Sequence, residues 1–282
     1  MLPLFAPDEF FDLYKLDEIE LVKIKKDDLN DIFPQGKESY TSNTIHWGFM
    51  KYERLTRTDR DQALREWTQA YLANVSFLDA QIGKILDALE NSRYAENTLV
   101  LFTSDHGYHL GEKNWLFKNS VWEESTRVPF VAAGPGLEAG SECRQPVSLI
   151  DIYPTLTDYC GLPGNPHAQT SGFELDGQSL VPLFKSKRPD EFDDYYALTA
   201  VGGLNQTEDT QVKLNRSHYT LRTDRYRYTR HGDGIRELYD HRNDPHEWNN
   251  LAGKPEYKDI EKQLSERLQS IVWNNKKPDF GL

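Results

Sequence analysis

The chain reads TLVLFTSDHG from residue 98 to residue 107. The first six of these residues form a continuous apolar run rich in strand formers, which predicts a short strand buried on both faces. A second run of this kind, VPFVAA, occupies residues 128–133. Apolar residues recur every three or four positions in residues 60–91, which predicts a long helix with Asp59 or Asp61 as its N-cap. A helix followed by buried strands is typical of an α/β layered domain.

The pattern of elements predicts two domains. Residues 1–58 are irregular and punctuated by proline, so we expect them to wrap over other elements rather than to form a domain of their own. The charged stretch 185–194 indicates a linker, and four short strand-like segments and a helix follow it. The segments are residues 195–201, 219–222, 226–230 and 237–240, and the helix covers residues 255–273. We therefore predict a large α/β domain over residues 1–185 and a smaller α+β domain with an antiparallel sheet over residues 186–282.

Composition excludes several classes of protein. The 282 residues are 38% hydrophobic and 28% charged, which excludes disorder as the global state. The formal net charge of -12 argues against a nucleic-acid partner, because phosphates attract a positive surface. Tyrosines and arginines cluster in residues 219–230. They are compatible with a nucleic-acid surface, but with this net charge and strand alternation they indicate a hairpin with a solvated basic face. No apolar run approaches the roughly 18 residues of a membrane span. Cys143 and Cys160 fit one disulfide or two buried thiols, so the compartment stays open.

Polar residues gather directly after the first predicted strand. Ligands of open α/β sheets bind beyond the carboxyl ends of strands, so Asp105 and His106 are candidate metal ligands. Neighbouring strand residues point to opposite faces, so both side chains can reach one ion only if the chain has left the strand. Gly107 permits the tight turn that this requires. The same residues are also compatible with Asp105 as a turn cap and His106 as an ordinary loop histidine.

A longer pattern surrounds this cluster. It comprises FTSDHGYHLGE at residues 102–112, Lys118 thirteen residues after Asp105, and EESTRVP at residues 123–129. Further matching stretches are residues 71–83, 146–156, 175–180, 237–240 and 243–247. Together they resemble the sulfatase family, and more closely the branch that includes iduronate-2-sulfatase and choline-sulfatase-like enzymes.

The resemblance implies a fold, a reaction and a site. The fold is an alkaline-phosphatase-like layered sheet with helices, here partial, plus a smaller C-terminal α+β subdomain. Asp105 and His106 match ligands of a divalent ion, calcium in most of the family, and Lys118 matches the lysine that reaches the sulfate ester. A cation and an ammonium suit the negative charge that sulfate-ester cleavage develops. Since calcium prefers oxygen ligands, His106 either touches the ion weakly or donates to a sulfate oxygen.

The expected activity is hydrolysis of a sulfate monoester of a carbohydrate or another small polar alcohol. A phosphate or phosphonate ester is the alternative substrate, because both anions are tetrahedral. His109 and His218 are further candidates for substrate contact. For His109 a structural role in the loop is the alternative, and for His218 an ordinary place at the start of a strand.

The nucleophile motif of the family is missing from this sequence. Sulfatases carry Cys or Ser in a Cys/Ser-x-Pro/Ala-x-Arg motif that is converted to formylglycine, and neither Cys143 nor Cys160 nor any serine lies in such a motif. The acidic pair that supplies the other metal ligands is also missing. We therefore expect an inactive fragment, or a subunit that needs a separate N-terminal half as its partner.

Overall fold

The computed structural model describes residues 4–32, 47–163, 175–186, 191–192, 195–202 and 217–274. They form two compact units. The first comprises the described residues up to Ser120 together with Glu124–Pro135, and the second comprises Val121–Glu123 together with the described residues from Gly136 onward. The predicted domain boundary after residue 185 lies inside the second unit, and the division into 1–185 and 186–282 stays a prediction.

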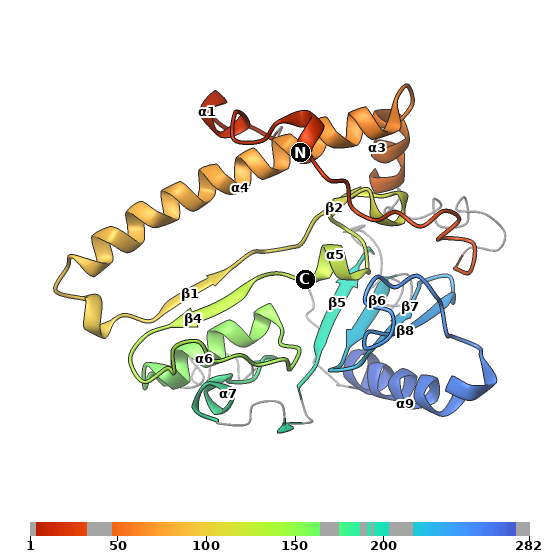
Figure 1. Ribbon diagram of the computed structural model, residues 1–282. Helices are drawn as coiled ribbons and strands as arrows, with labels where there is room; N and C mark the ends of the chain where they lie inside the picture. Colours follow the sequence, from red (N-terminus) through yellow and green to blue (C-terminus); the bar gives the residue numbers. More distant parts are fainter. Residues whose placement is uncertain are drawn as a thin grey trace, which may run out of the picture. The chain divides into compact units, whose positions relative to one another are not determined.

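The first unit contains most of the helical residues and two pairs of strands, β1 with β4 and β2 with β3 (Figure 1). Its elements are α1 (Asp8–Phe11), η1 (Leu16–Glu18), α3 (Trp47–Leu55), α4 (Arg60–Glu90), η2 (Ala95–Asn97), β1 (Val100–Thr103), β2 (His109–Leu110), η3 (Glu112–Asn114), β3 (Leu116–Phe117) and β4 (Phe130–Ala133). A short helix, α5 (Glu123–Thr126), begins on the last residue of the second unit's short segment and continues into the first unit.

Helix α4 confirms the long predicted helix. Asp59 caps it, since its carboxylate accepts a hydrogen bond from the Gln62 amide at 3.0 Å. The predicted apolar stripe is buried only toward the start of the helix, where Leu64 is 0% exposed, whereas Ile85 is 68% exposed. The irregular N-terminal segment lies along α4, as predicted for its described part. The Tyr14 hydroxyl is 2.6 Å from Ser76 Oγ, and α1 contacts α4 (Figure 1).

The strands β1 and β4 lie where the two apolar runs predicted them, and they pair antiparallel, with Phe102 opposite Val131. The expectation that both faces are buried is wrong. Phe102 is 37% exposed and Val131 is 56% exposed. Cross-strand partners share a face of the sheet, so one face of this two-stranded ribbon meets solvent among the described residues. An apolar run predicts a strand but does not show whether other elements pack against one face of it or both.

The segment between β2 and α5 is tightly anchored within the first unit. Strands β2 and β3 pair antiparallel, with His109 opposite Phe117. Between them, the Lys113 ammonium lies 3.1 Å from the Asp28 carboxylate, and both side chains are almost fully buried. This ion pair joins the N-terminal segment to the loop that follows the candidate metal ligands.

The second unit confirms the predicted antiparallel sheet and its covering helix. Its elements are η4 (Leu149–Asp151), α6 (Ile152–Tyr159), α7 (Val181–Lys185), β5 (Ala197–Val201), β6 (His218–Arg222), β7 (Tyr226–Arg230), β8 (Arg236–Asp240), η6 (Pro255–Tyr257), α9 (Lys258–Gln269) and the π-helical turn η7 (Ser270–Asn274). The strand order is β5-β6-β7-β8, with every neighbouring pair antiparallel.

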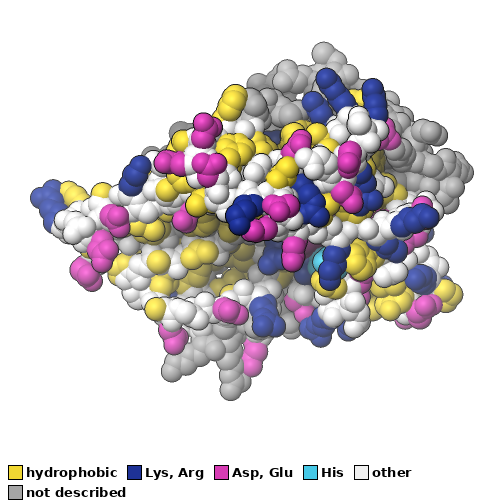
Figure 2. Space-filling model, turned by 45° about the horizontal axis from the view of Figure 1, so that its top comes forward, with side chains coloured by type: hydrophobic (Ala, Val, Ile, Leu, Met, Phe, Trp, Pro, Cys, Tyr) yellow, Lys and Arg dark blue, Asp and Glu magenta, His cyan; other side chains and the backbone are white. Residues whose placement is uncertain are grey.

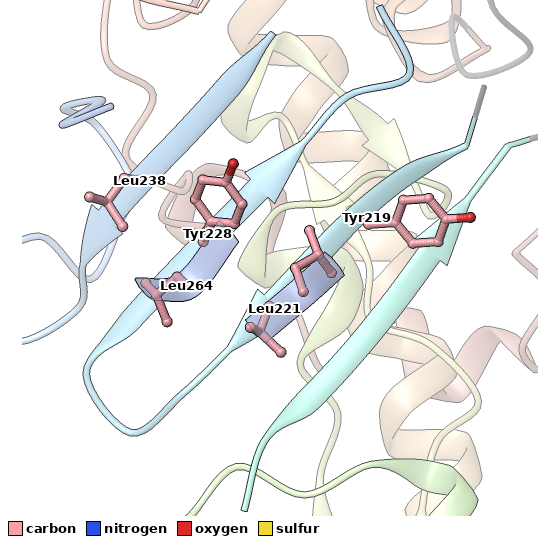
Figure 3. Close-up of a cluster of buried hydrophobic side chains, with 6 residues drawn as sticks. Tyr219, Leu221, Tyr228, Leu238 and Leu264 are labelled. Atoms are coloured by element: carbon pink, nitrogen blue, oxygen red, sulfur yellow. The ribbon is translucent and has the colours of Figure 1, made fainter. Parts of the chain in front are cut away.

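A hydrophobic core lies between this sheet and α9. Tyr219, Leu221, Tyr228 and Leu238 project from three strands toward Leu264 of the helix (Figure 3). Leu264 and Leu268 recur at helical spacing on one face of α9, and both are buried. Burial of this apolar surface is the main favourable term that holds the helix on the sheet.

The arginine-rich hairpin does not present a solvated basic face. Arg227 on β7 is 2% exposed, because its guanidinium pairs with Glu247 and Glu123. The predicted solvated basic face is wrong because strand alternation shows only which side chains share a face of the sheet. It does not show that acidic groups from other segments cover the face that carries Arg227. Elsewhere on the surface, Lys and Arg are interspersed with Asp and Glu (Figure 2).

Two smaller expectations are settled by the described residues. None of their helices has the length and apolar character to cross a membrane. Cys143 and Cys160 are both exposed and do not form a disulfide, so neither alternative from the sequence holds.

Candidate active site

Asp105 and His106 follow directly on β1, and their side chains face one another. The Asp105 Oδ1 and His106 Nε2 atoms are 3.5 Å apart. Asp105 is 82% exposed and His106 32% exposed, so both side chains are accessible from solvent. Two atoms at this separation can bind one ion as adjacent ligands. A carboxylate oxygen and an imidazole nitrogen would supply two of the several ligands that a metal ion requires.

The backbone fixes which nitrogen of His106 is available. His106 Nδ1 lies 2.7 Å from the Gly107 carbonyl oxygen, which can only accept, so Nδ1 carries the proton. In the neutral ring the lone pair is therefore on Nε2, the nitrogen that faces Asp105. Metal-binding histidines are commonly oriented by such a bond from the other ring nitrogen. In addition, the Ser104 hydroxyl donates to the His106 carbonyl at 2.9 Å and stabilises the bend.

Gly107 is required for a different reason from the one predicted. Its φ is not positive, so no left-handed turn demands glycine here. Instead, a Cβ at this position would lie 2.0 Å from the carbonyl oxygen of Glu124 and 2.7 Å from that of Arg127. The Gly107 amide also donates to the Ser125 carbonyl at 2.9 Å. The residue after His106 thus packs directly against the backbone of the α5 segment.

Replacing Gly107 with alanine is expected to destabilise the first unit by about 1–3 kcal/mol or more, because the colliding atoms are backbone and must move. The shift is also expected to displace the candidate ligands Asp105 and His106, and so to lower the calcium affinity predicted for them. Thermal denaturation and calcium titration check both effects. The matched control is Gly83→Ala on α4, where an added Cβ meets nothing within 4 Å and should preserve or raise stability. Equal melting temperatures for the two variants would contradict the packing argument.

Lys118 lies in the loop after β3 and is exposed. None of the described carboxylates pairs with its ammonium. The residues on either side, Phe117 and Asn119, have positive φ values of 73° and 66°. Such conformations cost free energy in residues other than glycine, and they are concentrated at functional sites. The left-handed residues are thus the two neighbours of Lys118, and the φ of Lys118 itself is not positive.

The two histidines predicted to contact substrate are both fully buried. His109 Nε2 lies 2.7 Å from Ser120 Oγ, on the far side of the same loop. His218 Nδ1 lies 2.7 Å from His231 Nδ1, and His231 Nε2 bonds to the Glu237 carboxylate. Their roles as substrate contacts stay predictions. Burial favours an indirect role for His109, because no part of its ring reaches solvent.

A second group of potential ligands was not found from the sequence. Glu123, His241 and Glu247 offer one ligand atom each within 4.8 Å of one another. Burial alone would raise the pKa of Glu247, yet the Arg227 guanidinium and His241 lower it to about 2. Arg227 Nε lies 2.5 Å from Glu247 and its Nη2 pairs with Glu123, so one guanidinium already neutralises both carboxylates of the group. We therefore interpret it as an internal ion network of the second unit. No sequence signal predicts it, because its members come from distant segments.

Comparisons with family models and curated proteins match this chain to sulfatases. The family model described as sulfatase matches residues 35–162, and the model described as the C-terminal part of N-sulphoglucosamine sulphohydrolase matches residues 111–274. A sulfatase of Formosa agariphila is 36% identical over 260 residues, which cover 91% of this chain and 45% of that protein. A choline-sulfatase of Rhizobium meliloti is 30% identical over 258 residues, which cover 90% of this chain and 44% of that protein.

Solved structures agree with these relatives. One of them, a complex with its substrate D-glucosamine-2-N,6-O-disulfate, has a TM-score of 0.63 at 25% identity, and the match covers 86% of this chain and 47% of that one. A phosphonate monoester hydrolase of Agrobacterium radiobacter has a TM-score of 0.61 at 27% identity, with 75% and 42% covered. The chain thus spans about half the length of the relatives it matches.

Proposed function

Because the chain belongs to the sulfatase family, we propose that its first unit contributes the metal and anion contacts of a site for sulfate monoesters. The observation that carries the proposal is the pair formed by Asp105 and His106, whose ligand atoms face one another at 3.5 Å directly after β1. A substrate of the sulfated-sugar class is favoured, because one structural neighbour is bound to a sulfated glucosamine.

Each of the three residues has a distinct task in this proposal. Asp105 offers a carboxylate oxygen and His106 its Nε2 lone pair to a divalent cation, which we propose to be calcium. The bound ion would polarise a sulfate oxygen. The Lys118 ammonium donates a hydrogen bond to another sulfate oxygen. Hydrolysis breaks the sulfur–oxygen bond to the alcohol, and positive charge held at the sulfate favours the transition state, in which negative charge develops on oxygen.

None of the 282 residues is proposed as the nucleophile. In the family it is formylglycine, and its motif does not occur among the 282 residues. We propose that a separate N-terminal segment supplies it. The appropriate test for this chain is therefore binding of the ester, since turnover requires a group that these residues do not provide.

Replacing Lys118 with alanine is expected to weaken binding of 4-nitrophenyl sulfate by about 10- to 100-fold in saturating calcium, because a hydrogen bond from a charged donor is lost. Asp105→Asn is expected to remove the dependence of ester binding on calcium. Isothermal titration of the folded 282-residue chain measures both effects. The matched control is Lys84→Ala, an exposed lysine of α4, for which no change is expected. If Lys118→Ala binds the ester as well as Lys84→Ala does, the proposal fails.

A phosphonate monoester is the second candidate substrate, since a phosphonate monoester hydrolase is among the structural neighbours above 25% identity. Both anions are tetrahedral and would make the same contacts with the ion and with Lys118. The same titration with a methylphosphonate monoester separates the two. Tighter binding of the sulfate ester supports the first candidate, and tighter binding of the phosphonate supports the second.

A further inference from the structure

The Trp115 indole bonds to the backbone of the proposed anion-binding residue. Its Nε1–H donates to the Lys118 carbonyl oxygen at 3.1 Å, three residues further along the chain. The indole is 0% exposed, and it packs edge-on against Phe49 with ring centroids 4.6 Å apart. A Cβ on Gly48 would lie 1.9 Å from the ring, so α3 and the indole are in direct contact. The donor that meets Lys118 is therefore held in a fixed position.

A second contact holds the other end of the loop. Ser120 Oγ lies 2.7 Å from Nε2 of the buried His109, which belongs to β2. Strand register places His109 opposite Phe117, so β2 lies beside the residue before Lys118. Lys118 thus stands between two buried contacts, one made by Trp115 to its own backbone and one made by His109 to Ser120.

The strain in the loop explains why such contacts are needed. Phe117 and Asn119 both have positive φ, a conformation that is unfavourable for a bulky residue such as Phe117 unless neighbouring contacts maintain it. Without the bond from Trp115, the Lys118 carbonyl loses this partner, and the peptide that follows it is held by fewer contacts. A lysine has a long flexible side chain, so its ammonium can be directed at one anion only if its Cα is fixed.

From this geometry we infer that Trp115 is a positioning residue: its indole N–H fixes the Lys118 backbone so that the ammonium meets a sulfate oxygen. The inference rests on the proposed function of Lys118. It also gives His109 a role as the second anchor of the loop in place of a direct substrate contact.

The test is Trp115→Phe, which removes the N–H donor and keeps an aromatic ring against Phe49. Binding of 4-nitrophenyl sulfate in calcium is expected to weaken by about 3- to 10-fold, the usual effect of one neutral hydrogen bond. Calcium affinity, measured without ester, is expected to stay unchanged because Asp105 and His106 are not part of this loop. Trp248→Phe in the second unit is the matched control, for which neither affinity should change.

A double-mutant cycle distinguishes positioning from a general loss of structure. Trp115→Phe combined with Lys118→Ala is expected to bind the ester no more weakly than Lys118→Ala alone. An equal loss in both backgrounds would overturn the inference, as would wild-type affinity in Trp115→Phe. If Trp115→Phe does not fold, Ser120→Ala removes the second anchor and must show the same non-additivity with Lys118→Ala. Failure of the proposed function is recognised separately, because Lys118→Ala itself would then have no effect.

Discussion

Replacing Arg227 with methionine is expected to destabilise the second unit by about 3–5 kcal/mol at pH 7. The guanidinium is 2% exposed and bonds to both Glu247 and Glu123. Its Nη1 atom also donates to Thr220 Oγ1 at 3.1 Å. Methionine fills a similar volume but leaves Glu247, which is 1% exposed, without its strongest counterion. A buried carboxylate without a cation is much less stable than the same group in water.

Urea denaturation followed by the far-UV signal measures this loss. The matched control is Arg242→Met, because Arg242 pairs with Asp224 on the surface and such pairs contribute at most about 1 kcal/mol. Equal stability of the two variants would contradict the network described for Arg227.

The pH dependence of the Arg227 effect has a definite sign. In the native protein the pKa of Glu247 is lowered from 4.5 to about 2, so its contribution to stability is present above pH 4.5 and is lost as the pH falls toward 2. Without Arg227 the largest cause that lowers this pKa is removed, so the pKa rises and the variant loses less stability in acid than the native protein does. The difference between native and variant proteins is therefore expected to shrink as the pH is lowered. A difference that grows in acid would contradict this assignment.

The second large effect is expected at the buried pair of Asp28 and Lys113 in the first unit. Both side chains are at most 3% exposed and their charged atoms are 3.1 Å apart. Asp28→Asn leaves the Lys113 ammonium buried without its carboxylate, which is expected to cost about 3–5 kcal/mol at pH 7. Asp28→Leu combined with Lys113→Met removes both charges and is expected to recover most of the loss. A single variant as stable as the native protein would contradict the pairing.

The pair also gives the native protein a pH dependence of opposite sign. Burial raises the pKa of Asp28 from 3.8 to about 6, although Lys113 opposes the shift. The folded state therefore holds a proton that the unfolded chain releases, so the contribution of Asp28 to stability falls as the pH rises from about 4 to 6. Over this window the loss is roughly 3 kcal/mol. In the paired Leu and Met variant this part of the pH profile is expected to disappear.

The local sequence pattern was sufficient to predict an element where the residues of that element alone determine its secondary structure. Helical spacing predicted α4, and two short runs of strand formers on either side of a turn predicted β6 and β7, because the residues that decide each element are neighbours in the sequence. Local pattern did not predict what covers a face. Arg227 is buried because acidic partners from distant parts of the chain cover it. Phe102 is exposed because none of the described residues covers its face of the strand.

The candidate site divides in the same way. Asp105 and His106 were found because they are neighbours in the chain and follow a strand. The reason for Gly107 could not be found, because the colliding carbonyl groups lie at Glu124 and Arg127. The hydrogen bond from Trp115 to Lys118 joins residues only three positions apart, yet the orientation of the indole depends on its packing against α3. Contacts of this kind require the folded structure.

A crystal structure of the 282-residue chain grown with calcium and a sulfate monoester is the most direct measurement for the proposed site. We expect one ion at about 2.3–2.6 Å from an Asp105 carboxylate oxygen, with His106 Nε2 beside it. One sulfate group is expected to contact that ion through one oxygen and the Lys118 ammonium through another. Calcium bound elsewhere, or a Lys118 side chain on a surface remote from Asp105 and His106, would contradict the account.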